Sequence, residues 1–338
     1  MLESGVMILM PSRILSTIVA AYLLLAGSVR ALDIQFDYTY DTGNFFVGHA
    51  DRQSLLDAAA AVFELRLTDT LTAITPSGTN TWTANFNNPT TGAAVMVSNP
   101  SIAQGVVRVY VGARQLGTTT LGIGGPGGFN AGGNQAWFNT VEARGQAGAL
   151  AATPTDFGPW GGAITFDLDT DWYFGSGSLA GKDDFLSVAT HEMGHLLGIG
   201  TADSWLAFVS GGNFTGPRST AANGGIQAGL SGSGHWADNT MSTIFGTNTA
   251  QEAAMSPSIT TGTQKYFTTL DFAGLQDIGW TVVPEPSGLA LLAGGLLALT
   301  GFSRRRWASG EGGSRPFEDA RAMTHRGQKA VDGSDRHS

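Results

Sequence analysis

The chain contains no cysteine. It therefore has no disulfide and no thiolate ligand for a metal, so stability must come from a packed core and from metals held by other side chains. Charged residues are also scarce, at 13% of the sequence, whereas glycine is abundant, with 48 residues. This composition favours a folded domain with long surface loops.

Basic side chains are few in the central part of the chain. Residues 32–283 contain 20 acidic and 8 basic side chains, which gives a net charge of −12. A protein that binds nucleic acid needs a basic face, so this balance argues against a nucleic-acid partner. It is typical of a soluble exported protein.

Long hydrophobic runs are missing as well. The apolar run after Arg13, residues 14–26, is too short for a comfortable membrane span, and small residues at Val29 and Ala31 flank Arg30 as in a cleavage site. These features predict a secretory signal peptide at residues 1–31, removed by signal peptidase, and a single folded domain at residues 32–283.

A second apolar run follows the motif Pro284-Glu285-Pro286. It spans residues 288–302 and ends at the arginine cluster 304–306. Residues 284–306 thus resemble the PEP-CTERM sorting signal of Gram-negative bacteria. The resemblance implies processing by an exosortase, transient anchoring in the inner membrane by a transmembrane helix, and a final location in the cell envelope, at the cell surface or outside the cell; an ordinary C-terminal anchor is the alternative. Residues 307–338 are expected to form a disordered polar tail.

The chemistry is indicated by His191-Glu192-Met193-Gly194-His195. Two imidazoles four residues apart lie on one helix face, which suits them to bind one Zn²⁺, and the glutamate between them can act on water at the metal. Asp183 and Asp184 offer an N-cap upstream, and Gly198 offers a helix stop downstream. A surface helix with ordinary histidines is the alternative interpretation.

The same residues resemble the metzincin zinc peptidases. His191 to Gly198 matches the start of their motif H-E-x-x-H-x-x-G-x-x-H/D, but Thr201 occupies the position of the third ligand. In leishmanolysin-like members the third histidine comes later, in a His-Trp pair before a methionine turn and a closing helix, and here Gly234-His235-Trp236, Met255 and residues 270–280 have that order.

Several residues are candidates for the third zinc ligand. We expect His235, because catalytic zinc usually has three protein ligands and the preceding Gly/Ser-rich stretch lets the backbone bend. Asp203 is the second candidate, and Glu252 would make the site one of the gluzincin type. His49 is expected at the surface. The resemblance further implies that Met255 forms a hydrophobic floor beneath the metal, and Tyr266 is the tyrosine nearest to the methionine turn.

The predicted activity follows from this ligand set. Zinc lowers the pKa of its bound water and polarises the scissile carbonyl, and Glu192 takes the proton from that water as general base. The sequence therefore predicts an exported zinc endopeptidase acting on proteins or peptides. The alternative is a catalytically silent surface or exopolysaccharide-matrix protein that keeps the peptidase fold.

A calcium site is a further prediction. Asp167 and Asp169 end an apolar strand in alternate positions and resemble the acidic stretch that holds structural calcium in matrixins. The spacing lacks the glycine and terminal glutamate of an EF-hand loop, so a solvated acidic face is the alternative.

The predicted fold class is α+β. Residues 32–40 and 106–111 and the stretch 163–168 are typical of strands, and residues 118–123 of an edge strand, with a flexible loop at residues 124–128. Leu56, Ala60 and Phe63 mark the buried face of a first helix, and residues 75–105 predict a loop-and-hairpin insertion. We expect a metzincin-like fold, with a mixed twisted sheet and the active-site helix in an N-terminal lobe, and a loop-rich C-terminal lobe from Gly200 onwards.

Overall fold

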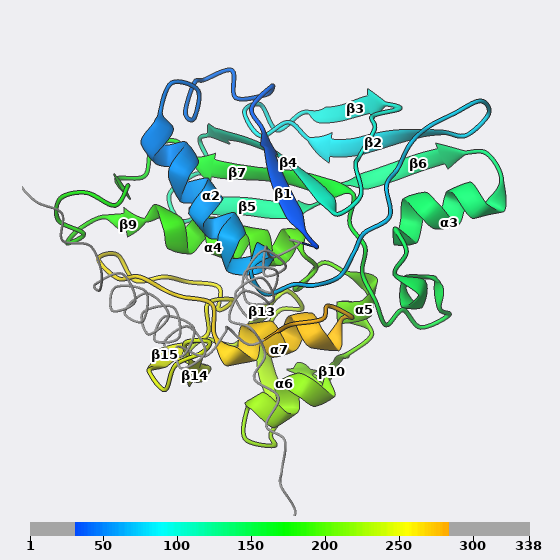
Figure 1. Cartoon of the computed structure of the whole chain (residues 1–338). Coiled ribbons are helices and arrows are strands. Elements are labelled where there is room, and N and C mark those ends of the chain that lie inside the picture. Colours follow the sequence, from blue (N-terminus) through cyan, green and yellow to red (C-terminus); the bar gives the residue numbers. More distant parts are fainter. Residues whose placement is uncertain (1–30, 284–338) are drawn as a thin grey trace, which may run out of the picture. The chain divides into compact units, whose positions relative to one another are not determined.

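The central sheet of the computed structural model, which describes residues 31–283, has four strands (Figure 1). Their order across the sheet is β1-β4-β7-β5; β1, β4 and β7 are parallel, and β5 is antiparallel to β7. Their bounds are β1 Asp33–Asp37, β4 Val106–Arg114, β5 Gly122–Pro126 and β7 Gly161–Asp167. The predicted mixed sheet within an α+β fold is thereby confirmed.

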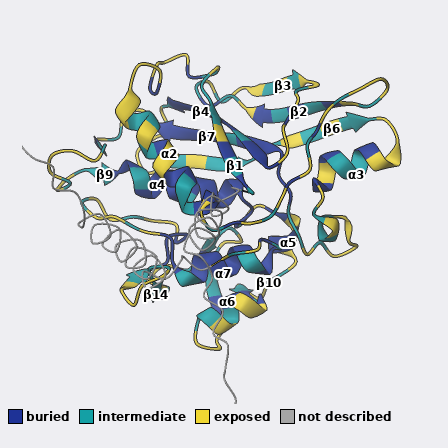
Figure 2. Cartoon of the chain, viewed as in Figure 1, coloured by how far each residue is buried: buried dark blue, intermediate teal, exposed yellow. Residues whose placement is uncertain are grey.

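The alternation of side chains along β4 separates two cores. Val107, Val109 and Val111 belong to the core between the sheet and the helices α2 (Ala50–Glu64) and α4 (Phe185–Leu196). On the other face, Val106 and Tyr110 join a second core. Figures 1 and 2 show α2 and α4 beside the sheet, with α4 almost wholly buried and α2 exposed along its outer side.

The second core lies beneath a smaller sheet of order β3-β2-β6. β2 and β3 form an antiparallel hairpin, as predicted for residues 75–105. The buried side chains of Trp82, Trp137 and Trp160 fill this core. The bounds are β2 Thr81–Asn87, β3 Ala94–Ser98, β6 Gly128–Gly132, α3 Gln135–Ala143 and the 3-10 helix η1 Ala147–Leu150.

The prediction of a flexible loop at residues 124–128 was wrong. Gly124 to Pro126 belong to β5, and Gly128 begins β6. Small residues suit these strands because other groups pack closely on them: a Cβ on Gly124 would lie 2.7 Å from the Cβ of Glu192. At Gly124, and at Gly127 where Trp160 packs closely, the absence of a side chain provides space for a neighbour.

From Gly200 onwards the elements are short, and most are strands of two to four residues. α7 carries the buried Leu270, Phe272 and Leu275 into the main core, and Trp205 and Trp236 pack beside them. The bounds in this part, and in the two short strands before α4, are β8 Trp172–Tyr173, β9 Asp183–Asp184, α5 Asp203–Leu206, β10 Val209–Ser210, β11 Asn213–Phe214, α6 Pro217–Ala222, β12 Ala228–Ser231, β13 His235–Trp236, β14 Met241–Thr243, β15 Ala250–Glu252 and α7 Thr269–Asp277.

The segments predicted at the two ends of the sequence lie outside the part of the chain that the structure describes. The signal peptide, the sorting signal with Pro284-Glu285-Pro286 and the polar tail fall on residues 1–30 and 284–338, which lie outside the described residues. These predictions, and the transmembrane helix among them, stay predictions. Within residues 31–283, no helix has the length and apolar character needed to cross a membrane.

Candidate metal centre

Local sequence fixes both ends of α4, the helix that carries the H-E-x-x-H motif. Asp184 caps its N-terminus, because its side chain accepts a hydrogen bond of 2.9 Å from the backbone N–H of Ser187. After the helix, Gly198 has a φ of +113°, a conformation that side-chain-bearing residues rarely adopt. The predicted N-cap and helix stop are confirmed.

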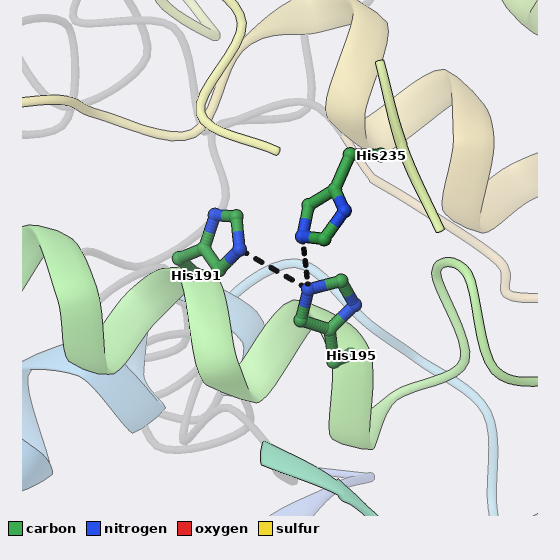
Figure 3. Close-up of side chains that lie close together, drawn as sticks. All are labelled: His191, His195 and His235. Atoms are coloured by element: carbon green, nitrogen blue, oxygen red, sulfur yellow. Dashed lines mark hydrogen bonds between the residues drawn. The ribbon is translucent and has the colours of Figure 1, made fainter. Parts of the chain in front are cut away.

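Three histidines converge beside this helix (Figure 3). His191 and His195 project from successive turns of α4, with their Nε2 atoms 3.1 Å apart. His235 approaches from β13, and its Nε2 lies 3.0 Å from that of His195. We call these residues the histidine triad. In residues 31–283 it is the one group of three or more potential metal-binding side chains whose ligand atoms lie close enough for a single ion.

The other candidates for the third ligand lie elsewhere. Asp203 begins the short helix α5, and Glu252 pairs with the ammonium of Lys265 at 2.8 Å. His49 precedes α2 and is exposed, as expected. Thr201, at the position where the short motif expects a ligand, donates its hydroxyl to the carbonyl of His195. His235 is therefore the candidate that the fold brings to His191 and His195.

The hydrogen bonds of the rings fix where the protons lie. Nδ1 of His191 is 2.8 Å from the carbonyl oxygen of Ala254, and Nδ1 of His195 is 2.8 Å from that of Ile199. A carbonyl oxygen only accepts, so each Nδ1 carries the proton and each neutral ring leaves a lone pair on Nε2. Two lone pairs then face each other across 3.1 Å with no proton between them. That arrangement is repulsive by itself, and a cation between the rings turns it into an attractive one.

The surroundings keep the triad uncharged at neutral pH. Burial lowers the pKa of His191 well below its usual value and lowers that of His195 to about 4. The pKa of His235 is lowered too, again chiefly by burial. Tetrahedral zinc with bonds of about 2.0–2.1 Å separates its nitrogen ligands by about 3.3 Å. The donor type, protonation and spacing of the triad therefore fit a zinc-like ion.

Backbone contacts deliver His235 to the helix. Its neighbour Trp236 donates its backbone N–H to the carbonyl of Met255 at 3.1 Å, and its indole N–H to Asp271 Oδ1 at 2.9 Å. Met255 is fully buried beneath α4. A Cβ on Gly194 would lie 2.5 Å from the sulfur of Met255, so the glycine in the motif makes room for this packing. Met255 thus occupies the position expected of the methionine-turn residue.

Asp271 is a functional residue that the sequence reasoning missed. Its buried carboxylate caps α7 through Thr268 and also accepts the backbone N–H groups of Ala254 and Met255. One side chain therefore ties together the strand of His235, the methionine turn and the backbone that orients His191. The spacing Thr268-x-x-Asp271 could have indicated the helix cap, but its tertiary partners are distant in sequence.

Glu192 lies between α4 and the edge strand β5. It is 6% exposed, and a Cβ on Gly122 would lie 2.6 Å from its Oε1. Burial raises its pKa to about 8, and the N–H of Gly124 acts in the opposite direction by stabilising the carboxylate. A cation in the triad would lower this pKa further towards its usual value. Glu192 is thus placed to exchange a proton beside the triad near neutral pH.

A cavity of about 520 Å³ opens onto these residues. Glu192 and the triad line it, together with residues 119–124, which include the first three residues of β5. Tyr266, the tyrosine nearest to the methionine turn, lines a different cavity and is 48% exposed. Tyr266 is therefore not among the residues that line the cavity beside the triad.

Of the two predicted calcium residues, Asp167 is hydrogen-bonded within the turn after β7. The buried carboxylate of Asp167 accepts the backbone N–H groups of Leu116 and Asp169 and the hydroxyl of Thr170. These hydrogen bonds hold the turn after β7. Neither Asp167 nor Asp169 belongs to a group of three potential metal-binding side chains in the described part of the chain, and calcium stays a prediction.

Comparison with known proteins finds a family match that includes the helix with the H-E-x-x-H motif. The family model described as Matrixin matches residues 128–208, a stretch that runs from β6 through α4 and contains His191, Glu192 and His195 but not His235. No curated protein and no solved structure matches the chain. The chain thus carries a segment similar to the matrixins, which are zinc-dependent metallopeptidases, and that segment includes α4.

Proposed function

We propose that this chain is a zinc-dependent endopeptidase. The observation that carries the proposal is the pair of neutral Nε2 lone pairs 3.1 Å apart on His191 and His195, with His235 completing the set. The matrixin match over residues 128–208 supports the same activity. Three neutral imidazoles keep the full charge of the ion, which suits a catalytic zinc with one position open to water.

The residues of the chain have distinct roles in this proposal. The triad holds the ion, and the carbonyls of Ala254 and Ile199 keep two of its rings oriented. Zinc, when bound, supplies a Lewis acid that activates water and polarises the scissile carbonyl. Glu192 takes the proton of the attacking water and passes it to the leaving amine. The buried position of Glu192 between α4 and β5 excludes bulk water from its carboxylate.

The substrate is proposed to bind along β5. This strand is at the edge of the central sheet, paired with β7 on one side, and its residues line the cavity beside the triad. An extended peptide can add to such an edge through backbone hydrogen bonds. We therefore propose unfolded proteins or flexible peptide segments as substrates.

Export is part of the same proposal, with localisation in the cell envelope or outside the cell. It rests on the sequences of residues 1–31 and 284–306 and their expected processing by signal peptidase and an exosortase. The alternative, a catalytically silent surface protein, is not favoured: a protein with no catalysis to perform needs no buried glutamate beside the triad.

The test is cleavage of casein by the purified full chain, with and without a zinc chelator, beside Glu192→Gln. Cleavage that the chelator abolishes and zinc restores, and that falls at least about 100-fold in the variant, supports the proposal. The variant should keep its bound zinc, because Glu192 is not a ligand. Folded, zinc-loaded protein that cleaves nothing, or cleavage unaffected by Glu192→Gln, contradicts it.

A further inference from the structure

The cavity beside the triad extends along α4 towards the N-terminus of the helix. Ser187 and Val188, one turn before His191, line this part of the cavity together with residues 257–259 after the methionine turn. Lys265 lines the same space. A side chain of a peptide held at the metal would enter this space, which we call the side pocket.

The chain that follows residues 257–259 is fixed to the start of α4. The backbone N–H of Lys265 donates to Ser187 Oγ at 2.8 Å, and Gln264 Nε2 donates to Asp184 Oδ1 at 3.1 Å. Thr261 Oγ1 donates to Asp183 Oδ1 at 2.9 Å. These contacts hold residues 261–265 against the start of α4, so the position of the Lys265 backbone is set by the fold.

Lys265 gives the side pocket its charge. Among the residues that line the cavity, it is the one basic group that is cationic at neutral pH, and Glu192 is the one acidic group. Its Nζ donates to the carbonyl of Ser258 at 2.6 Å and to Glu252 Oε2 at 2.8 Å. An ammonium has three donors, so one N–H is not used by these two acceptors. The side chain is only 10% exposed, which limits screening of its charge by water.

Glu252 offsets this charge from outside the cavity. Its other oxygen, Oε1, accepts the backbone N–H of Asn239, so the carboxylate is held away from the pocket. The field of Lys265 still reaches the triad: burial is the main cause of the lowered pKa of His191, and Lys265 adds to it. A substrate carboxylate in the side pocket would therefore share the ammonium with Glu252, and its attraction to Lys265 would add to the contacts that hold the substrate.

We infer that Lys265 is a specificity residue that makes the enzyme favour substrates with an acidic side chain, Asp or Glu, directly beside the cleaved bond. This inference rests on the proposed function, because it names the substrate class of the same site. A carboxylate gains a charge-assisted hydrogen bond in the pocket, an amide side chain gains a weaker one, and a lysine side chain is repelled.

The experiment compares peptides that differ at one position. A peptide library digested by the full-length, zinc-loaded protein first shows which flanking position is selective. Peptides with Glu, Gln, Leu or Lys there are then compared by kcat/KM. We expect the wild-type protein to cleave the Glu peptide at least about 10-fold better than the Lys peptide. Lys265→Met should bring this ratio close to one, whereas Lys265→Arg should retain it.

A matched variant changes the ratio in the other direction. Glu252→Gln removes the compensating charge and keeps Lys265, so the preference for Glu over Lys should increase. A ratio that is the same in the wild type, Lys265→Met and Glu252→Gln overturns the inference while leaving peptidase activity established. No cleavage of any peptide by folded, zinc-loaded protein overturns the proposed function, and the inference with it.

Discussion

The two parts of the molecule contribute to the triad in different ways. The part before Gly200 supplies His191 and His195 from one regular helix, so their spacing follows from helix geometry alone. The part after Gly200 supplies His235 from the two-residue strand β13, which has no regular geometry of its own to position a ligand. Tertiary hydrogen bonds centred on Asp271 and Met255 do this instead. Half of the site is thus encoded locally, and the other half depends on the folded core.

The largest effect should come from removing a ligand on the helix. His195→Ala takes away the ring whose Nε2 contacts both of the others, and two imidazoles are left to hold the ion. We expect bound zinc to fall from about one per chain to background, with loss of peptidase activity. Metal analysis after dialysis measures this. His49→Ala is the control, since His49 is exposed and outside the triad, and zinc retained by His195→Ala would contradict the proposed site.

The next prediction tests the tertiary half of the site through two buried aspartates of α7. Asp271→Ala leaves N–H groups of Trp236, Ala254 and Met255 without their acceptor, and we expect zinc affinity to fall about 10–100-fold. The free energy of unfolding should fall by about 3 kcal/mol. Competition with a chromophoric chelator and denaturant unfolding give the two values.

Asp277→Ala provides the matched control for Asp271→Ala. Asp277 is also buried, but its carboxylate accepts the backbone N–H groups of Arg218 and Ser219 at α6, away from the triad. The Asp277→Ala variant should have a lower free energy of unfolding than the wild type and an unchanged zinc affinity. If Asp271→Ala does not fold, Asp271→Asn, which keeps one acceptor oxygen, replaces it. Equal zinc affinities for the variants at the two positions would show that Asp271 has no special role in holding the metal site.

The same division explains how much could be predicted from the sequence. The helix, its cap at Asp184 and the stop at Gly198 follow from local patterns, and the structure has all of them. The Gly/Ser-rich residues before His235 indicate that it can reach the metal. The residues that position its strand cannot be predicted from the sequence, because they lie far from it along the chain. Asp271 was overlooked for the same reason. The sequence predicts a loop at the glycines of β5, because sequence alone does not distinguish a glycine that bends the chain from a glycine that leaves space for a neighbouring group.

A smaller effect is expected from filling the space between β5 and α4. Gly122→Ala adds a methyl group where Glu192 Oε1 lies, 2.6 Å from the new Cβ, so the carboxylate must move. We expect kcat to fall about 10–100-fold with zinc content unchanged, because the displaced group is the general base and not a ligand. Gly125→Ala is the control on the same strand, since a Cβ there meets nothing within 4 Å. Equal activities of the two variants would argue against the assigned position of Glu192.

The smallest effect is expected at Met255, where the two halves of the site touch. Its side chain is fully buried beneath Gly194, whereas its backbone carries the hydrogen bonds to Trp236 and Asp271. Met255→Leu keeps that backbone and nearly conserves volume, so the free energy of unfolding should fall by less than about 1.5 kcal/mol. Zinc affinity should stay within about threefold of the wild-type value, because no side-chain atom of Met255 holds a ligand. Titration with zinc and denaturant unfolding test both statements. A large loss of affinity without a loss of stability would mean that the methionine side chain itself shapes the metal site, and that the tertiary half of the site depends on side-chain packing as much as on the hydrogen bonds of Asp271.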